Sequence, residues 1–123
     1  MNKIVVLFLD VENAKDPEVI EIDNDNLNEF KRLIGCEHID VTRRSFGGKR
    51  FCIVCDDVGA LKHDRKLSCW AFTQYTRIYG NVIIACEKGE DLDSLSKIDL
   101  VRLNSCVAQY HTDKVYKVLK IDS

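Results

Sequence analysis

The stretch Trp-Ala-Phe-Thr-Gln-Tyr-Thr-Arg-Ile-Tyr-Gly-Asn-Val-Ile-Ile-Ala-Cys-Glu, residues 70–87, organises the rest of the chain. Its second half, residues 82–86, is short, rich in β-branched residues and almost without polar groups. Such a run is typical of a strand that is covered on both faces, so we predict a central strand here. Gly80 precedes it and can adopt a positive φ, which suits a tight entry into a strand.

Flat and cationic side chains lead into this predicted strand. They are Phe72, Tyr75, Arg77 and Tyr79, and Asn81 follows them. An aromatic ring can stack on a nucleobase, and a guanidinium can bind a phosphate through paired hydrogen bonds. The other interpretation is that these aromatic residues fill a hydrophobic core, and the sequence leaves both open.

Length and charge restrict the possible classes of protein. At 123 residues the chain is long enough for one core, so we predict a single domain over residues 1–123. The formal net charge of −2 disfavours a protein that neutralises many DNA or RNA phosphates, but it permits a small anionic ligand. No apolar run is long enough for a membrane span, and the N-terminus lacks a signal-peptide cleavage site. We therefore expect a cytoplasmic protein that acts without a membrane.

The chain contains six cysteines, at positions 36, 52, 55, 69, 86 and 106. Without a secretory signal, we interpret them as reduced thiols that pack as small apolar side chains. Cys52 and Cys55 form a Cys-x-x-Cys pair inside a predicted strand, where their odd spacing directs them to opposite faces. No second pair with ligand spacing follows, so we predict no metal site and no cofactor.

The β-rich apolar run at 3–9 predicts another central strand, and further strands are predicted at 17–22, 36–45, 49–55 and 115–121. The first two would form one hairpin, and residues 36–55 would form another around Phe46-Gly47-Gly48. Four cations cluster at the second turn, namely Arg43, Arg44, Lys49 and Arg50. This basic turn, residues 43–50, is explained either by solubility of an exposed loop or by binding to a phosphate.

Two segments have helical periodicity. Residues 25–34 place apolar side chains at intervals of three to four, between N-capping Asp and Asn residues and Gly35. A longer helix is predicted from Asp93 or Ser94 to about Tyr110, with two apolar stripes. Because two stripes require two covered sides, we expect this helix to lie at the interface of a symmetric homodimer. The predicted fold class is therefore α+β, with a mostly antiparallel sheet, an N-terminal amphipathic helix and a longer C-terminal helix at a dimer interface.

The polar segment 56–68 joins the second hairpin to the organising stretch and contains His63, Arg65 and Lys66. Loops of this length in compact domains are often functional. Arg65 and Lys66 lie in a part of this loop that could close over an anion near Phe72. The alternative is that His63 is a surface histidine without a function.

Three segments occur in a characteristic order: Asp-Asp-x-Gly-Ala-Leu-Lys at 56–62, Gly-Asn-Val-Ile-Ile at 80–84, and Asp-Leu-Asp-Ser-Leu-Ser at 91–96. In this order and spacing the chain resembles a family of small phage and prophage proteins, formerly of unknown function, that includes Thoeris anti-defence proteins acting as signal sponges. The resemblance covers most of the chain and is greatest to clostridial prophage members.

The resemblance implies a protein that is not an enzyme. It would bind a cyclic ADP-ribose isomer made by a bacterial TIR-domain enzyme and would release it intact. Relatives of this kind form homodimers, some of which assemble into hexamers and hold cyclic di- or trinucleotides at separate sites. By the resemblance, Phe72 would stack on the adenine, Asn81 would hydrogen-bond the ligand, and Arg65 and Arg77 would contact the pyrophosphate. The partner subunit would contribute Arg102 and Asn104.

Two further functions remain open from the residues themselves. The basic turn could contact and inhibit a host enzyme. A thiol- or metal-dependent enzyme could be built on Cys52 and Cys55. The sequence contains no Ser/His/Asp set, no paired carboxylates in an apolar setting and no Walker-type phosphate loop, so nothing in it requires catalysis.

Overall fold

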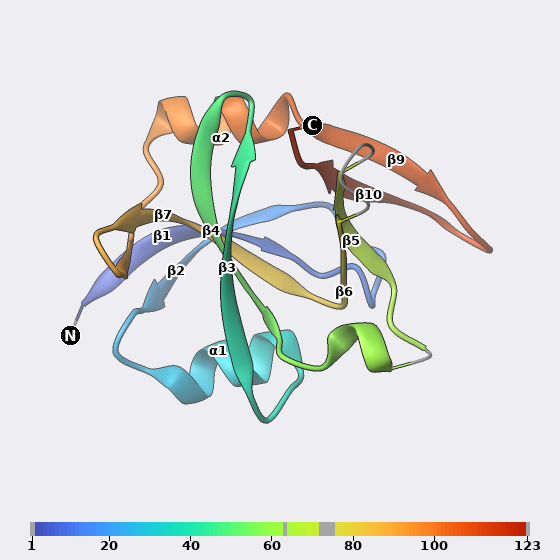
Figure 1. The fold of residues 1–123 in the computed structure, drawn as a ribbon, viewed down its shortest axis with the longest axis horizontal. Helices are drawn as coiled ribbons and strands as arrows, with labels where there is room; N and C mark the ends of the chain where they lie inside the picture. Colours follow the sequence, from blue (N-terminus) through green and yellow to red (C-terminus); the bar gives the residue numbers. More distant parts are fainter. Residues whose placement is uncertain (1, 63, 72–75, 123) are drawn as a thin grey trace.

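The computed structural model describes residues 2–62, 64–71 and 76–122, and within them the chain folds as α+β with mostly antiparallel sheets (Figure 1). The strands are β1 (Lys3–Leu9), β2 (Glu18–Asp23), β3 (Ile39–Phe46), β4 (Lys49–Asp56), β5 (Leu67–Ala71), β6 (Thr76–Tyr79), β7 (Val82–Lys88), β8 (Asp91–Asp93), β9 (Val107–His111) and β10 (Val115–Lys120). The helices are α1 (Leu27–Ile34), the 3₁₀ turn η1 (Gly59–Leu61) and α2 (Lys97–Asn104).

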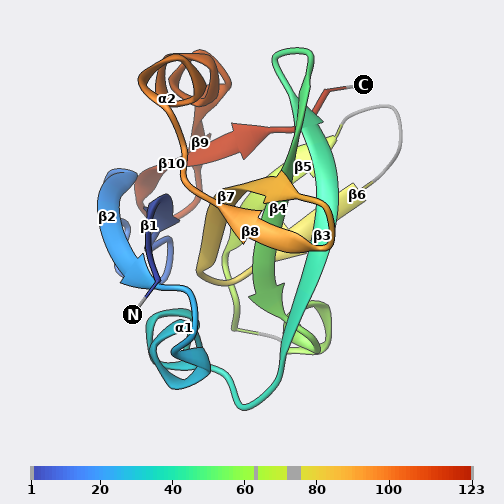
Figure 2. The same cartoon turned by 90° about the vertical axis from the view of Figure 1, so that its left-hand side faces the viewer.

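The predicted central strand is confirmed as β7. Within the described residues, the first sheet has the order β2-β1-β7-β4-β3, and β8 folds back onto the end of β7. Ile84 is paired with Leu7 of β1 on one side and with Ile53 of β4 on the other. Residues 82–86 are all buried, as expected for a strand covered on both faces. Both predicted hairpins, β1–β2 and β3–β4, are present and antiparallel (Figure 2).

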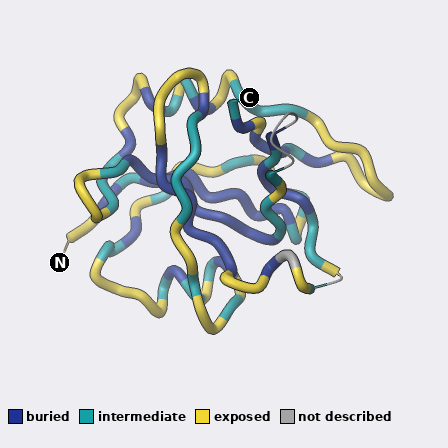
Figure 3. The backbone as a smooth tube through the Cα atoms, viewed as in Figure 1, coloured by how far each residue is buried: buried dark blue, intermediate teal, exposed yellow. Residues whose placement is uncertain are grey.

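The second sheet has the order β6-β5-β10-β9 in the described part of the chain. Its β5–β10 pair is parallel, and the other two pairs are antiparallel. The main hydrophobic cluster draws on both sheets, and a second cluster lies between the first sheet and α1. Buried backbone is accordingly concentrated in the centre of the molecule (Figure 3). The first sheet is thus covered on its two faces by different elements.

Helix α1 confirms the predicted helix at 25–34. The Asn26 side chain accepts a hydrogen bond from the Glu29 backbone N–H, and Gly35 ends the helix in the left-handed conformation with φ of 78°. Phe30 and Ile34 are buried against the sheet. Local capping and periodicity therefore agree with the tertiary packing.

The prediction of a long helix from Asp93 or Ser94 to about Tyr110 is wrong beyond residue 104, and the helix is capped by Ser96 and not by Asp93 or Ser94. Helix α2 ends at Asn104, and residues 107–111 form strand β9, paired with β10 over five residues. The apolar residues of 107–111 therefore serve a sheet, because pairing with β10 satisfies their backbone groups. Both α-helices have eight residues, so the C-terminal helix is not the longer one.

A buried carboxylate fixes α2 to the second hairpin. Asp99 and Ser96 form a capping box, in which each side chain accepts a hydrogen bond from the other's backbone N–H. Lys49 Nζ lies 2.6 Å from Asp99 Oδ1. Burial alone would raise the pKa of Asp99, but the hydrogen bonds from Lys49 and Ser96 lower it well below its usual range. The position of α2 therefore depends on an ionised aspartate.

The thiols in the structure are reduced, and four of the six are buried, at positions 52, 55, 69 and 86. Burial raises the pKa of Cys55 and of Cys69 to about 12, so neither thiol ionises at neutral pH. Within the described residues, no helix is long and apolar enough to cross a membrane.

Candidate functional site

The structure distributes the predicted site residues over three places. Asn81 and Arg65 belong to one polar network, Arg77 lines a separate cleft, and Arg102 and Asn104 lie on α2. Phe72 and Tyr75 fall outside the described residues, as does His63. The described site is therefore built from the network and the adjoining cleft.

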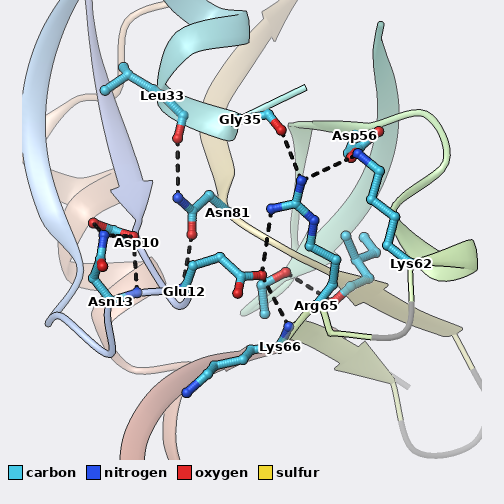
Figure 4. A network of polar contacts seen from close by, with 12 residues as sticks. Asp10, Glu12, Asn13, Leu33, Gly35, Asp56, Lys62, Arg65, Lys66 and Asn81 are labelled. Carbon is cyan, nitrogen blue, oxygen red and sulfur yellow. Dashed lines mark hydrogen bonds and ion pairs between the residues drawn. The ribbon is translucent and has the colours of Figure 1, made fainter. Parts of the chain in front are cut away.

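Asn81 lies directly before β7 and joins two distant segments (Figure 4). Its Oδ1 accepts a hydrogen bond of 3.1 Å from the Glu12 backbone N–H, and its Nδ2 donates one of 3.1 Å to the Leu33 carbonyl. The residue is only 8% exposed. Both polar groups of the amide are thus engaged inside the protein, so a hydrogen bond to a ligand would compete with these contacts.

Arg65 crosses the same region from the loop that precedes β5 (Figure 4). Its Nη2 donates a hydrogen bond of 2.8 Å to the Gly35 carbonyl. Its guanidinium also lies 3.8 Å from the Glu12 carboxylate and 3.7 Å from the Asp56 carboxylate. The Glu12 carboxylate also accepts a hydrogen bond from the Lys66 backbone N–H. These contacts hold the loop against the end of α1 and the turn after β1.

Asp56 connects this network to the neighbouring cleft. Its carboxylate lies 2.5 Å from Lys62 Nζ, and it is almost completely buried. Burial raises the pKa of Asp56, but the hydrogen bonds from Lys62 and the Val58 backbone outweigh it, and the net pKa is lowered. Asp56 is therefore ionised and already neutralised by a lysine.

The cleft, of about 220 Å³, lies between the β3–β4 hairpin and β6. We name it the arginine cleft. Its lining residues are Asp40, Thr42, Arg44, Cys55, Asp56, Asp57, Gly59, Thr76, Arg77, Ile78 and Tyr79. Two guanidinium groups, from strands of different sheets, therefore line one concave surface.

Arg44 has unused hydrogen-bonding capacity. Its Nη1 donates to the Arg43 carbonyl at 3.0 Å, whereas its Nε is buried without a hydrogen-bond partner in the described structure. Arg102 Nε is the other buried side-chain nitrogen of this kind there, but it lies away from the cleft. A buried donor without a partner costs about 1–3 kcal/mol, so an acceptor brought into the cleft would relieve this cost.

Carboxylates also line the cleft. Asp40 and Asp57 are exposed, and neither forms an ion pair with a described residue. The lining thus offers cationic donors together with anionic acceptors. A phosphate can bind the cationic donors, and hydroxyl or amino groups can bind the anionic acceptors.

The shape of the cleft depends on Gly59. A Cβ at this position would lie 2.8 Å from the carbonyl oxygen of Tyr79, which is too close for any side chain. Glycine therefore permits η1 to approach the backbone of β6, and this approach forms one wall of the cleft.

The remaining predicted residues lie on α2. The Arg102 guanidinium donates to the Gly47 carbonyl of the basic turn, so within this chain it supports the turn. Asn104 is exposed and lines a different groove, together with Val19 and Val101. Neither residue reaches the arginine cleft of its own chain.

Most cations of the basic turn are held in ion pairs. Arg43 and Arg50 both pair with Glu87, and Lys49 pairs with Asp99. Arg44 is the cation of this turn without a carboxylate partner in the described structure, and it faces the cleft. The geometry does not favour the turn as a surface that contacts a host enzyme.

Arg44 is thus a functional candidate that the sequence analysis assigned only to a basic turn. The sequence feature that could have identified Arg44 is its place in the strand β3. Neighbouring residues of a strand point to opposite faces, so Arg44 and Arg43 must lie on different faces of the sheet. The high thiol pKa values disfavour a thiolate nucleophile at Cys55. Among the described residues, no group of three or more His, Cys, Asp or Glu side chains is arranged to hold a metal ion.

Comparison with known proteins gives one match. Residues 4–106 match a family model described as a domain of unknown function, DUF3846. The matched region runs from β1 to the end of α2 and includes both the polar network and the arginine cleft. No curated protein and no solved structure matches the chain.

Proposed function

The chain belongs to the DUF3846 family, and we propose that it binds a small nucleotide-derived anion in the arginine cleft and holds it without chemical change. The observation that carries the proposal is the convergence of Arg44 and Arg77 on one cleft, with the Nε of Arg44 buried and unpartnered. A phosphate oxygen is a suitable acceptor for both guanidinium groups. Ligand binding would therefore satisfy a donor that the protein alone leaves unused.

The carboxylates narrow the class of ligand. Asp40 and Asp57 suit the hydroxyl groups of a ribose, whereas a ligand made of phosphate alone would be repelled by them. The described cleft is smaller than the roughly 300 Å³ of a typical small-molecule site. It would hold the ribose and phosphate part of a ligand. Phe72 and Tyr75, which join β5 to β6 in the chain, would take the base.

The sequence resemblance supports a more specific proposal for the ligand and for the role of the protein. The ligand would be a cyclic ADP-ribose isomer made by a TIR-domain enzyme, and the protein would act in the bacterial cytoplasm as an anti-defence sponge. The polar network around Asn81 and Arg65 would keep the cleft rigid and so reduce the entropy lost on binding. Cyclic di- or trinucleotides are a second group of ligands to be tested in the same assay.

The test is a retention experiment. The protein is mixed with the cyclic ADP-ribose isomer, free ligand is removed, and the ligand released by heating is identified by mass spectrometry. We expect intact ligand in amounts that saturate. Recovery of an altered molecule would contradict sequestration, and no retention of any of these nucleotides would contradict the binding proposal.

Variants connect retention to the cleft. Arg44→Gln and Arg77→Gln should each weaken binding about 10- to 150-fold, because a charge-assisted hydrogen bond contributes about 1.5–3 kcal/mol. Arg32→Gln is the matched control, since Arg32 pairs with Glu29 on the surface of α1. Equal losses in all three variants would show that net charge, not the cleft, determines affinity.

We also propose that the chain forms a homodimer through the exposed side of α2. Val101 is 72% exposed and Val19 is 52% exposed, and both line a groove of about 510 Å³. Ile98 is 71% exposed on the same helix. Exposed apolar side chains that gather along one groove are typical of an interface. Light scattering should give the mass of a dimer for the natural chain and of a monomer for Val101→Lys, and a monomeric natural chain would contradict this proposal.

A further inference from the structure

A second groove lies on the other face of the first sheet, between α1, the β3–β4 hairpin and β8. Its volume is about 440 Å³. Val41 and Arg43 line it, whereas the alternate residues Thr42 and Arg44 line the arginine cleft. Because neighbouring residues of a strand point to opposite faces, the two sites are separated by the sheet itself.

The groove is mainly apolar. Phe30 and Val54 are buried within it, and Leu27 and Val41 remain 51% and 36% exposed. Ile39 and Leu92 complete its apolar lining. The sheet thus exposes apolar surface beside α1 that a ligand of matching shape could cover.

Charge is distributed unequally around the groove. Arg43 lines it, and Glu87 accepts hydrogen bonds from Arg43 Nε at 3.0 Å and from Arg50 Nε at 2.7 Å. Two guanidinium groups share one carboxylate, so this cluster carries one net positive charge. The Arg43 side chain is 33% exposed and therefore accessible to a ligand.

The β7–β8 turn has the opposite character. Glu90 and Asp91 line the groove there, and Asp91 is fixed by a hydrogen bond from Asn24. An anionic head group would be repelled by this turn and attracted to the Arg43 cluster. The charges therefore define where in the groove an anionic head group would lie, namely beside Arg43 and away from Glu90 and Asp91.

We propose that this groove binds an amphiphilic carboxylate, such as a medium-chain fatty acid, with its chain over Phe30 and Val54 and its head group on Arg43. The apolar lining accounts for the chain, and the positive cluster accounts for the carboxylate. This site is independent of the nucleotide proposed for the arginine cleft, because it uses other residues on the opposite face of the sheet.

Titration calorimetry with decanoate and decanol, both below their aggregation limits, tests the proposal. We expect saturable binding of decanoate and at least tenfold weaker binding of decanol. Val41→Trp and Leu27→Trp should each fill the groove and remove decanoate binding. Val115→Trp is the control, because Val115 is similarly exposed at 53% on β10.

Arg43→Gln should weaken decanoate binding about tenfold and leave decanol unchanged. Arg32→Gln is its matched control, since Arg32 also pairs with a glutamate, Glu29, but does not line the groove. No saturable binding, unchanged affinity in both groove-filling variants, or equal affinity for decanoate and decanol would each overturn the proposal. A change of molecular mass in both groove-filling variants would instead identify a second copy of the chain as the occupant, and would also overturn it.

Discussion

Replacing Asn81 by alanine separates a structural role from a ligand-binding role. The substitution removes the acceptor of the Glu12 N–H and the donor to the Leu33 carbonyl, both at 3.1 Å. The site is only 8% exposed, so solvent replaces these partners poorly. At about 1–2 kcal/mol for each partner left unsatisfied, the loss of unfolding free energy should be about 2–4 kcal/mol.

Urea denaturation measures this loss directly. For a small protein with an m-value of about 2 kcal/mol/M, the midpoint should fall by about 1–2 M while m stays the same. Asn28→Ala is the control, because Asn28 is an exposed asparagine on α1, and its unfolding free energy should change by less than about 0.5 kcal/mol. A similarly small change for Asn81→Ala would refute the proposed structural role.

Asn81→Asp provides an independent check of the same reasoning through its pH dependence. The introduced carboxyl must be protonated to donate to the Leu33 carbonyl, so burial and this contact should raise its pKa in the folded state. Its favourable contribution would be fully present below the unfolded-state pKa and would be lost as the pH rises through the folded-state pKa. The stability of this variant relative to the natural chain should therefore increase on acidification. A difference that does not vary with pH would contradict the proposed geometry.

Three further outcomes are expected. Asp99 has a lowered pKa in the folded state, so its contribution to stability is present above the unfolded pKa of about 3.9 and is lost as the pH falls further. Asp99→Asn should reduce this acid sensitivity and cost about 1–3 kcal/mol in urea denaturation at pH 7. Gly59→Ala should destabilise the fold by about 1–3 kcal/mol and weaken ligand retention, because the new methyl group would lie 2.8 Å from the Tyr79 carbonyl oxygen. A thiol reagent at neutral pH should modify only the partly exposed Cys36 and Cys106 in the native protein, and all six thiols in urea. Rapid modification of a buried thiol in the native state would contradict its burial.

The elements that the sequence predicted correctly are those in which local and tertiary preferences agree. Helix α1 has its cap at Asn26, its stop at Gly35 and its buried Phe30 within one short segment. The hairpins are likewise defined by alternation around a turn. The central position of β7 follows from an apolar run without a polar face. In each case a few neighbouring residues determine both the conformation and the surface that is buried.

The error at residues 105–110 has the opposite origin. Val107 and Ala108 continue the apolar spacing of α2, so a helical period fits them as well as a strand does. Their conformation is determined by β10, with Val118 paired to Ala108 and Leu119 paired to Val107. These partners are about ten residues further along the chain, beyond the range that helical periodicity can report.

The site shows the same limit in its side chains. A sequence reveals that Arg43 and Arg44 are neighbours, but the face on which each lies depends on the pairing of the strand. In the structure Arg43 shares the carboxylate of Glu87, 44 residues away, with Arg50, whereas Arg44 shares the cleft with Arg77. Two adjacent arginines of one basic turn therefore have different chemical roles, one as part of an ion cluster and the other as an unsatisfied donor. The single variants Arg43→Gln and Arg44→Gln should accordingly affect different ligands. Arg43→Gln should weaken binding of decanoate, and Arg44→Gln should weaken binding of the nucleotide. If both variants weakened the same ligand equally, the sheet would not separate the two sites.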